Sequence, residues 1–251
     1  MVRRTKHEAQ ATREHLLDTA EQVILARGLS RTSLQDIAQA AGLSRGAIYW
    51  HFADKVALFN AIMDRVDLPL EQALALAEVG LPAGPGAPGL PLPTPAEPGA
   101  SSAAPAAPNP LQVLRTLALE PFALMHRDPR ARRAFTILLH RAEFVGELAP
   151  LAGRQADAIQ DCQGQMARLF QQAAQRGLLA PDISPAVAAT ALLGLIDGLL
   201  RLCTQRDDAS AGGPMAAVAP AIDALLAGMS ATGPGGPRPW PNPLVTTVQP
   251  A

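Results

Sequence analysis

The sequence predicts an all-α protein, with an N-terminal three-helix domain followed by a larger C-terminal helical body. Aromatic residues make up only 4% of its 251 residues, and runs of alternating Val, Ile and aromatic residues, which would indicate strands, are missing. Apolar residues recur instead at helical spacing, between residues that typically begin or end helices. We expect domains at 1–55 and 56–230 and a disordered tail at 231–251, a division that suits a chain of this length.

The first expected helix runs from about Ala11 to Arg27. Its larger apolar residues fall on one stripe, and Gly28 follows at a position where glycine commonly ends a helix. The stripe consists of Leu16, Leu17, Ala20, Val23 and Ile24.

Residues 33–55, SLQDIAQAAGLSRGAIYWHFADK, predict two short helices that cross at a glycine turn. Gly42 tolerates the left-handed backbone of such a turn, and Ser44 is a good cap for the helix that follows. Ala38 is small enough to let the helices approach, and Ile48 supplies a shared aliphatic contact. This spacing indicates a helix-turn-helix, which reads DNA with its second helix. An ordinary helical hairpin would share the glycine and the periodicity.

The same residues spell G-x-S-x-G from Gly42 to Gly46, which is the sequence of the nucleophile elbow in hydrolases. That elbow requires a buried strand before the serine. The residues before Gly42 have helical spacing, so we interpret Ser44 as a helix cap. A helical serine hydrolase that uses Ser44 is kept as an alternative.

With the flanking RGLSRTS and GAIYWHFADKVALF, the segment from about Thr12 to Asp67 resembles the DNA-binding domain of the TetR family of transcriptional repressors. It is similar in particular to the local repressors of multidrug efflux pumps. The body resembles that subgroup more loosely, chiefly in RRAFTILLHRAEF and LLGLIDGLLR. The resemblance implies a cytoplasmic, nucleoid-associated homodimer that binds double-stranded DNA at an inverted-repeat operator.

Arg45 is the side chain expected to read a base, most naturally guanine, because it projects from the first turn of the second motif helix. Gly46 and Ala47 leave room for the backbone to approach thymine methyl groups. The remaining expected DNA contacts, most of them to phosphates at positions that match the family, are Thr32, Ser33, Gln35, Ser44, Tyr49, His51 and Lys55.

The aromatic residues beside these positions divide by expected role. Trp50 and Phe52 are expected in the core. His51 is interpreted as a simple phosphate donor, and a pH sensor is the alternative.

Positive charge gathers at the N-terminus, although the net charge of the chain is −1. Arg3, Arg4, Lys6 and Arg13 are balanced only by Glu8. Such an arm can meet phosphates or enter the minor groove, and a frayed, solubilising terminus is the alternative.

Residues 80–109 are rich in Pro, Gly and Ala, which predicts a disordered insertion in the body. A tolerated surface insertion and a segment that docks a partner protein both fit this composition. The tail at 231–251 has the same character, and its Trp240 is unexplained.

A fourth helix is expected from about Asp54. Further helices are expected at 111–126, 128–146, 151–176, 184–206 and 214–229. The helix at 184–206 is apolar around most of its circumference, so it must be covered on every side. We expect a second copy of the chain to supply part of that cover, with Gly194 and Gly198 allowing close approach, while Pro220 complicates the packing of the last helix. A buried helix within one monomer is the alternative.

The resemblance also implies a pocket in the body for a hydrophobic small-molecule inducer. Its expected lining is Phe135, Leu139, Cys162, Leu193, Ile196, Asp197 and Leu200. Asp197 would be a polar anchor among apolar neighbours, because burying a carboxylate without a partner is costly. An ion pair with Arg201 or another arginine, or a cap on a neighbouring helix, is the alternative.

Several other function classes are not expected. Cys162 and Cys203 form neither a disulfide framework nor a metal site, and no cofactor, metal or enzymatic activity is expected. No signal peptide is apparent, and the apolar stretch from Val187 to Ile196 is expected to be too short to span a membrane.

The sequence therefore predicts a ligand-responsive repressor, released from its operator by a hydrophobic compound and controlling a multidrug efflux operon. The alternative is a helix-turn-helix regulator whose body docks a partner protein through the Pro-rich insertion.

Overall fold

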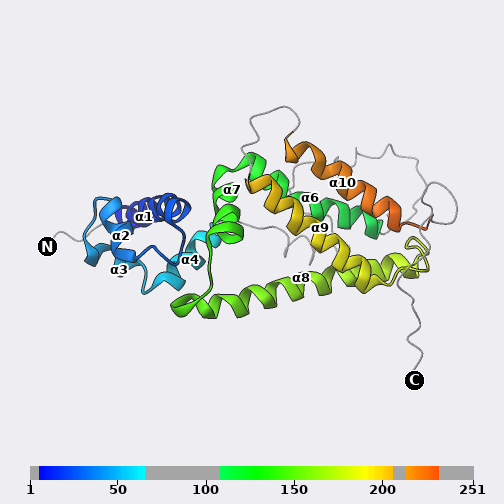
Figure 1. Cartoon of the computed structure of the whole chain (residues 1–251), viewed down its shortest axis with the longest axis horizontal. Coiled ribbons are helices and arrows are strands. Elements are labelled where there is room, and N and C mark those ends of the chain that lie inside the picture. The colour runs from blue at the N-terminus through cyan, green and yellow to red at the C-terminus, as the bar shows by residue number, and fades with distance from the viewer. Residues whose placement is uncertain (1–5, 66–107, 206–212, 232–251) are drawn as a thin grey trace, which may run out of the picture.

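The computed structural model describes residues 6–65, 108–205 and 213–231. Four helices form a head at one end of the molecule (Figure 1): α1 (Lys6–Arg27), α2 (Leu34–Ala40), α3 (Arg45–His51) and α4 (Lys55–Met63). The body contains α6 (Pro110–Arg127), α7 (Pro129–Thr136), α8 (Ala149–Gln175), α9 (Pro185–Gln205) and α10 (Pro214–Met229). A π-helical turn, η1 (Ile137–Arg141), and a 3-10 turn, η2 (Gly146–Leu148), lie between α7 and α8. The all-α prediction is confirmed.

The head is held together by a small apolar core that all four helices share. Helix α1 begins at Lys6, earlier than the expected Ala11, and ends at Arg27 as expected. Within the head it packs against α2 and α4. The fully or almost fully buried residues are Leu16, Leu17, Ala20, Ile24, Ile37, Ala38, Ile48, Leu58 and Ile62.

The turn between α2 and α3 has the backbone that the glycine predicts. Gly42 adopts a φ of 67°, in the left-handed region. Its N–H donates to the carbonyl of Gln39 at 3.1 Å, and the N–H of Leu43 donates to that of Ala38 at 2.8 Å. This is a Schellman motif, which satisfies carbonyls that the end of α2 leaves open. The turn therefore fixes the angle at which α3 leaves α2.

Helix α9 is the central helix of the body and contacts α6, α7, α8 and α10. Its inner face buries Leu192, Ile196, Leu199 and Cys203. Among the described residues, α9 is also the helix that is long enough and apolar enough to cross a membrane. The helix extends beyond the expected stretch, Val187–Ile196, at both ends, and Asp197 and Arg201 lie within it. Its place at the centre of the body accounts for its composition equally well.

One other expectation needs correction, and two others fall largely outside the described residues. The helix expected from Asp128 to Gly146 is α7 followed by η1, and the chain then leaves helical geometry at Ala142. Most of the expected insertion at 80–109 and of the tail at 231–251, including Trp240, lies outside the described residues. Asn109 is described, and it caps α6: its side chain accepts a hydrogen bond from the N–H of Leu111 at 3.0 Å.

Candidate nucleic-acid interface and its junction with the body

Helix α3 presents a polar outer face over a buried inner one. Ile48 is fully buried, whereas Arg45 and Gly46 are exposed and Tyr49 is 46% exposed. The Arg45 guanidinium carbon lies 5.4 Å from the centroid of the Tyr49 ring. This cation–π contact keeps the arginine on the outer face at the start of the helix, with its donors available for a planar, bidentate partner.

Ser44 serves as the cap of α3. Its hydroxyl accepts a hydrogen bond from the N–H of Ala47 at 3.2 Å. The segment before it is the helix α2, followed by the Gly42 turn, so the strand that a nucleophile elbow needs is replaced by a helix. The hydrolase alternative has no support in this geometry.

Ser33 and Asp36 form a reciprocal capping box at the start of α2. The Ser33 hydroxyl accepts from the N–H of Asp36 at 3.1 Å, and the Asp36 carboxylate accepts from the N–H of Ser33 at 2.9 Å. The side-chain hydrogen bond from Ser33, and then its backbone hydrogen bond, hold the pKa of Asp36 below its usual value. The box fixes the first turn of α2, on which Ser33 and Gln35 are exposed.

Two residues expected to contact phosphates are buried instead. The Thr32 residue is 2% exposed, and its hydroxyl donates to the carbonyl of Gly28 at 2.8 Å. The Lys55 side chain is 8% exposed, and its ammonium lies 2.9 Å from Glu147 Oε1 while donating to the carbonyl of Ser30 at 3.2 Å. Sequence reasoning missed the body carboxylate, because nothing in the local pattern links residues so far apart.

The aromatic residues around His51 are placed differently from one another. Phe52 is 2% exposed, as expected, but Trp50 is 72% exposed, so its assignment to the core was wrong. The Trp50 and His51 rings meet edge to face, with their centroids 4.5 Å apart. The outer surface of the motif therefore carries an indole that the sequence analysis had placed inside.

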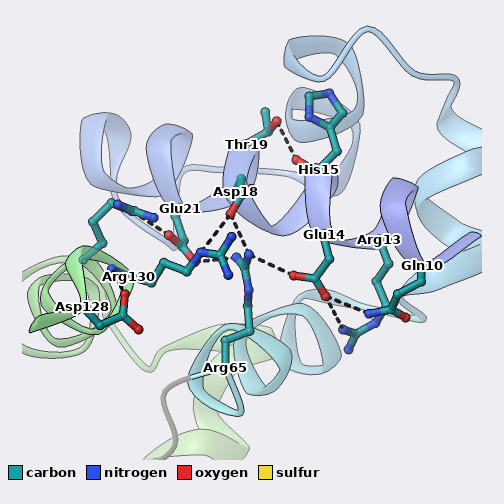
Figure 2. A network of polar contacts seen from close by, with 11 residues as sticks. Gln10, Arg13, Glu14, His15, Asp18, Thr19, Glu21, Arg65, Asp128 and Arg130 are labelled. Atoms are coloured by element: carbon teal, nitrogen blue, oxygen red, sulfur yellow. Dashed lines mark hydrogen bonds and ion pairs between the residues drawn. The ribbon is translucent and has the colours of Figure 1, made fainter. Parts of the chain in front are cut away.

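A network of charged side chains joins α1 to the end of α4 (Figure 2). Arg65, just beyond α4, contacts Glu14 at 3.0 Å, Asp18 at 2.6 Å and Glu21 at 2.7 Å. Burial lowers the pKa of Arg65, but the hydrogen bond to Asp18 and the three negative charges outweigh it, so the pKa is raised above its ordinary value. Its side chain is 9% exposed, and the arginine is thus held as a permanent cation.

Glu21 is the centre at which this network reaches the body. Its residue is 1% exposed, and its second carboxylate oxygen contacts Nε of Arg133, on α7, at 2.7 Å. Each oxygen of one buried carboxylate is therefore bound by an arginine from a different element. Breaking such a pair from one side leaves a charge without compensation, so we expect α1, α4 and α7 to keep their arrangement at this point.

A second set of contacts joins the head to the segment 141–148, which includes η2. The N–H of Leu29 donates to the carbonyl of Arg141 at 2.8 Å, and the Ser30 hydroxyl donates to Glu143 at 3.1 Å. The rings of Phe59 and Phe144 pack edge to face with centroids 5.7 Å apart. Together with the Lys55–Glu147 pair, these contacts connect the segment to both ends of the α2–α3 motif.

Six of the seven expected ligand-binding residues face the interior of the body or its edge. They come from α7, η1, α8 and α9, and belong to or pack against one apolar core: Phe135, Leu139, Cys162, Leu193, Ile196 and Leu200. Their position among four elements is what a pocket between helices would require. Core packing accounts for the same positions.

Asp197 does not join this set. Its side chain is 52% exposed, on the same side of α9 as the exposed Gly194 and Gly198, and it accepts from Arg201 at 2.9 Å. The ion-pair alternative is therefore the one the structure supports, and the buried anchor was wrong for this chain. Arg201 also donates to the carbonyl of Leu139 at 3.0 Å, so the pair links α9 to η1.

His140, on η1, makes a polar contact with α9. His140 Nε2 lies 2.8 Å from Thr204 Oγ1, and the Thr204 residue is 9% exposed. The Thr204 hydroxyl donates its proton to the carbonyl of Leu200 at 2.7 Å, so the histidine must be the donor of the pair. Only the π turn brings these residues together, and for this reason the sequence pattern gave no sign of it.

A helix-turn-helix head with an exposed arginine on its second helix, joined to a helical body, defines the class of one-component DNA-binding regulators. Comparison with known proteins gives the family. Residues 16–62 match the model for bacterial regulatory proteins of the tetR family, and residues 109–204 match the C-terminal region of MAATS-type transcriptional repressors. The chain belongs to the TetR family.

Curated relatives match both parts of the chain. It is 33% identical over 201 residues to the transcriptional regulator TtgR of Pseudomonas putida, covering 80% of this chain and 84% of the relative. It is 36% identical over 199 residues to the transcriptional repressor BepR of Brucella suis, covering 79% and 83%.

Solved structures share the arrangement of head and body. NalD, the secondary repressor of the MexAB-OprM multidrug efflux pump in Pseudomonas aeruginosa, is 29% identical with a TM-score of 0.69, over 90% of this chain and 98% of NalD. SmeT, the repressor of the SmeDEF multidrug efflux pump of Stenotrophomonas maltophilia, is 27% identical with a TM-score of 0.61, over 93% of this chain and 99% of SmeT.

Proposed function

We propose that this protein is a cytoplasmic, non-enzymatic repressor that binds an inverted-repeat operator as a homodimer and controls a multidrug efflux operon. The observation that carries the proposal is the exposed start of α3, where Arg45 lies over Tyr49 beside a glycine. The relatives that repress efflux pumps support the physiological part of the proposal.

In this proposal Arg45 reads a guanine, because its donors match O6 and N7 in the major groove. Gly46 and Ala47 face thymine methyl groups, and contacts to the DNA backbone come from Ser33, Gln35, Ser44, Tyr49 and His51. One such head discriminates weakly, since each bidentate pair contributes about 1 to 3 kcal/mol. Two heads on successive major grooves roughly double that total, which is why the operator is an inverted repeat.

The dimer forms, we propose, through the outer face of α9. Val187 is 61% exposed and Leu202 is 52% exposed, and Gly194 and Gly198 lie on the exposed surface between them. No side chain lies within 4 Å of a Cβ built on either glycine, so a second helix can approach the backbone closely. This face has small residues at its centre, beside the Asp197–Arg201 pair, and is suited to a two-fold helix contact.

The inducer is a hydrophobic compound that enters between α7, α8 and α9. Its entry would move η1, which is hydrogen-bonded to Arg201 on one side and to Leu29 of the head on the other. A ligand shifts the equilibrium only by its differential affinity, and coupling of about 1 to 3 kcal/mol would weaken operator binding some five- to 150-fold.

The DNA-binding part is tested with duplexes that the wild-type protein selects from a random pool. We expect the selected sequences to be inverted repeats, and Arg45→Ala, which removes one bidentate pair from each head, to weaken binding by about 30-fold or more while relaxing the preference at one base pair in each half-site. Arg154→Ala, which removes an exposed arginine from α8, is the matched control and should bind like the wild type. Equal affinity for selected and scrambled duplexes would refute the proposal.

A further inference from the structure

The Lys55–Glu147 pair joins a buried cation to the most exposed carboxylate among the charged contacts described at the junction. Lys55, from the head, has a side chain only 8% exposed, whereas Glu147, from the body, has one 63% exposed. At the other centre of the junction, Glu21 is 1% exposed and both arginines that bind it are at least partly buried. The Glu147 carboxylate can therefore return to water at little cost, while Glu21 cannot.

The Lys55 ammonium cannot return to water in the same way. Its ammonium uses one donor on the Ser30 carbonyl and another on Glu147. A largely buried cation is strongly disfavoured without a compensating anion. If Glu147 leaves, another anion has to take its place.

The position of Lys55 within the head suggests which anion that is. Lys55 begins α4, shortly after α3 ends at His51. Its ammonium donates to the carbonyl of Ser30, three residues before Ser33, the cap of α2. Ser33, Tyr49 and His51 are among the proposed contacts to the DNA backbone. The lysine therefore lies beside the loop that enters α2 and follows α3 along the chain, close to residues that we propose contact phosphates.

We propose that Glu147 and a DNA phosphate compete for Lys55, so that operator binding exchanges an internal carboxylate for a phosphate. This inference rests on the proposed function. The exchange breaks the Lys55–Glu147 contact between α4 and the 141–148 segment when the head binds DNA. Conversely, whatever holds Glu147 against Lys55 weakens operator binding, which makes Glu147 a positioning residue that sets affinity without touching DNA.

The test measures operator affinity of the full-length protein at several salt concentrations, with a duplex selected by the wild-type protein from a random pool. Glu147→Gln removes the competitor and should bind about two- to five-fold more tightly, the range expected for losing a partly exposed ion pair. Glu143→Gln is the matched control, because it removes the same charge from the same segment but contacts only the Ser30 hydroxyl. It should change affinity less than Glu147→Gln does.

A second set of variants tests whether Lys55 is the group for which Glu147 and the phosphate compete. Lys55→Met should weaken binding and reduce the slope of log K against log salt by about 0.9 for each protomer, or about 1.8 for the dimer. In the Lys55→Met background, Glu147→Gln should give no gain beyond that of Glu143→Gln. Equal gains from the two glutamate variants, or a Glu147→Gln gain that persists without the lysine, would overturn the proposal.

If Lys55→Met does not fold, the comparison of Glu147→Gln with Glu143→Gln still tests the competition. Both carboxylates are on the surface, so we expect these two variants to fold. A wild-type protein that selects no duplex would refute the proposed function, and the competition with it. A wild-type protein that selects an inverted repeat while Glu147→Gln and Glu143→Gln behave alike would refute the competition alone.

Discussion

At the scale of single residues, the head is defined by caps whose partners are within three positions of one another. The Ser33–Asp36 box satisfies two N–H groups at the start of α2, and the Ser44 hydroxyl satisfies one at the start of α3. Such contacts depend on local sequence alone, and for this reason the Ser44 cap could be predicted from the sequence. The buried Lys55 is the opposite case, since its partner comes from the body.

The lowered pKa of Asp36 makes the capping box dependent on pH. Its folded-state pKa lies below the ordinary value of 3.8, so its contribution to stability is present above about pH 4 and is lost as pH falls through the folded-state pKa. We expect Asp36→Ala to lower the melting temperature at neutral pH. The difference between variant and wild type should shrink as the pH is lowered below about 4, measured by circular dichroism. A difference that stays constant would show that the charge of Asp36 is not what stabilises the turn.

At the scale of elements, α3 illustrates how a helix can be suboptimal for stability and suited to binding. Gly46 lies in its first turn, where alanine would favour the helix. A Cβ at this position would meet only Ser44 Oγ, at 3.9 Å, which is ordinary contact. Gly42 differs, because its φ of 67° disfavours any side chain.

Gly46→Ala should therefore separate stability from DNA binding. We expect the variant to be more stable by about 0.5 to 1 kcal/mol in urea denaturation, because alanine loses less backbone entropy than glycine. Operator binding should be weaker, because the added methyl group stands where the helix backbone approaches the bases. Unchanged affinity would mean that this face of α3 does not enter the groove.

The π turn η1 shows where element-level prediction fails. Helical spacing continues past Thr136, so one helix was expected through Gly146, yet the chain widens at Ile137 and leaves the helix at Ala142. The carbonyls of Leu139 and Arg141 are bound from outside, by Arg201 of α9 and by the N–H of Leu29. π turns often mark functional positions, and this one connects body and head.

At the scale of the whole molecule, the head and the body are joined by a buried charge centre. Glu21 is bound by Arg65 and Arg133, from the two sides of the junction. Its rigidity and the exposure of Glu147 divide the junction into a fixed contact and a releasable one. In the proposed competition, DNA binding breaks the Lys55–Glu147 contact while the Glu21 centre stays in place.

Glu21→Gln should destabilise the protein by about 3 kcal/mol, at the low end for breaking a buried ion pair from one side, because Arg65 keeps Asp18 and Glu14. Glu14→Gln also removes a carboxylate from Arg65, but its side chain is 37% exposed, and it should cost less than about 1 kcal/mol. Free energies of unfolding from urea denaturation give both values. Equal, small losses would contradict the central role of Glu21.

What the sequence by itself determined was the all-helical fold, the helix-turn-helix and its caps, and the family, because these follow from short-range spacing. The exposure of Trp50 and Asp197 and the burial of Thr32 and Lys55 were decided only by tertiary structure. The surroundings of Lys55 come from an element distant along the chain, the turn before α8, whereas the Thr32 hydroxyl is bound by the nearby carbonyl of Gly28 and Asp197 by the nearby Arg201. A local pattern fixes which face of a helix is apolar, but it does not specify which distant carboxylate or helix meets the residues at its edges.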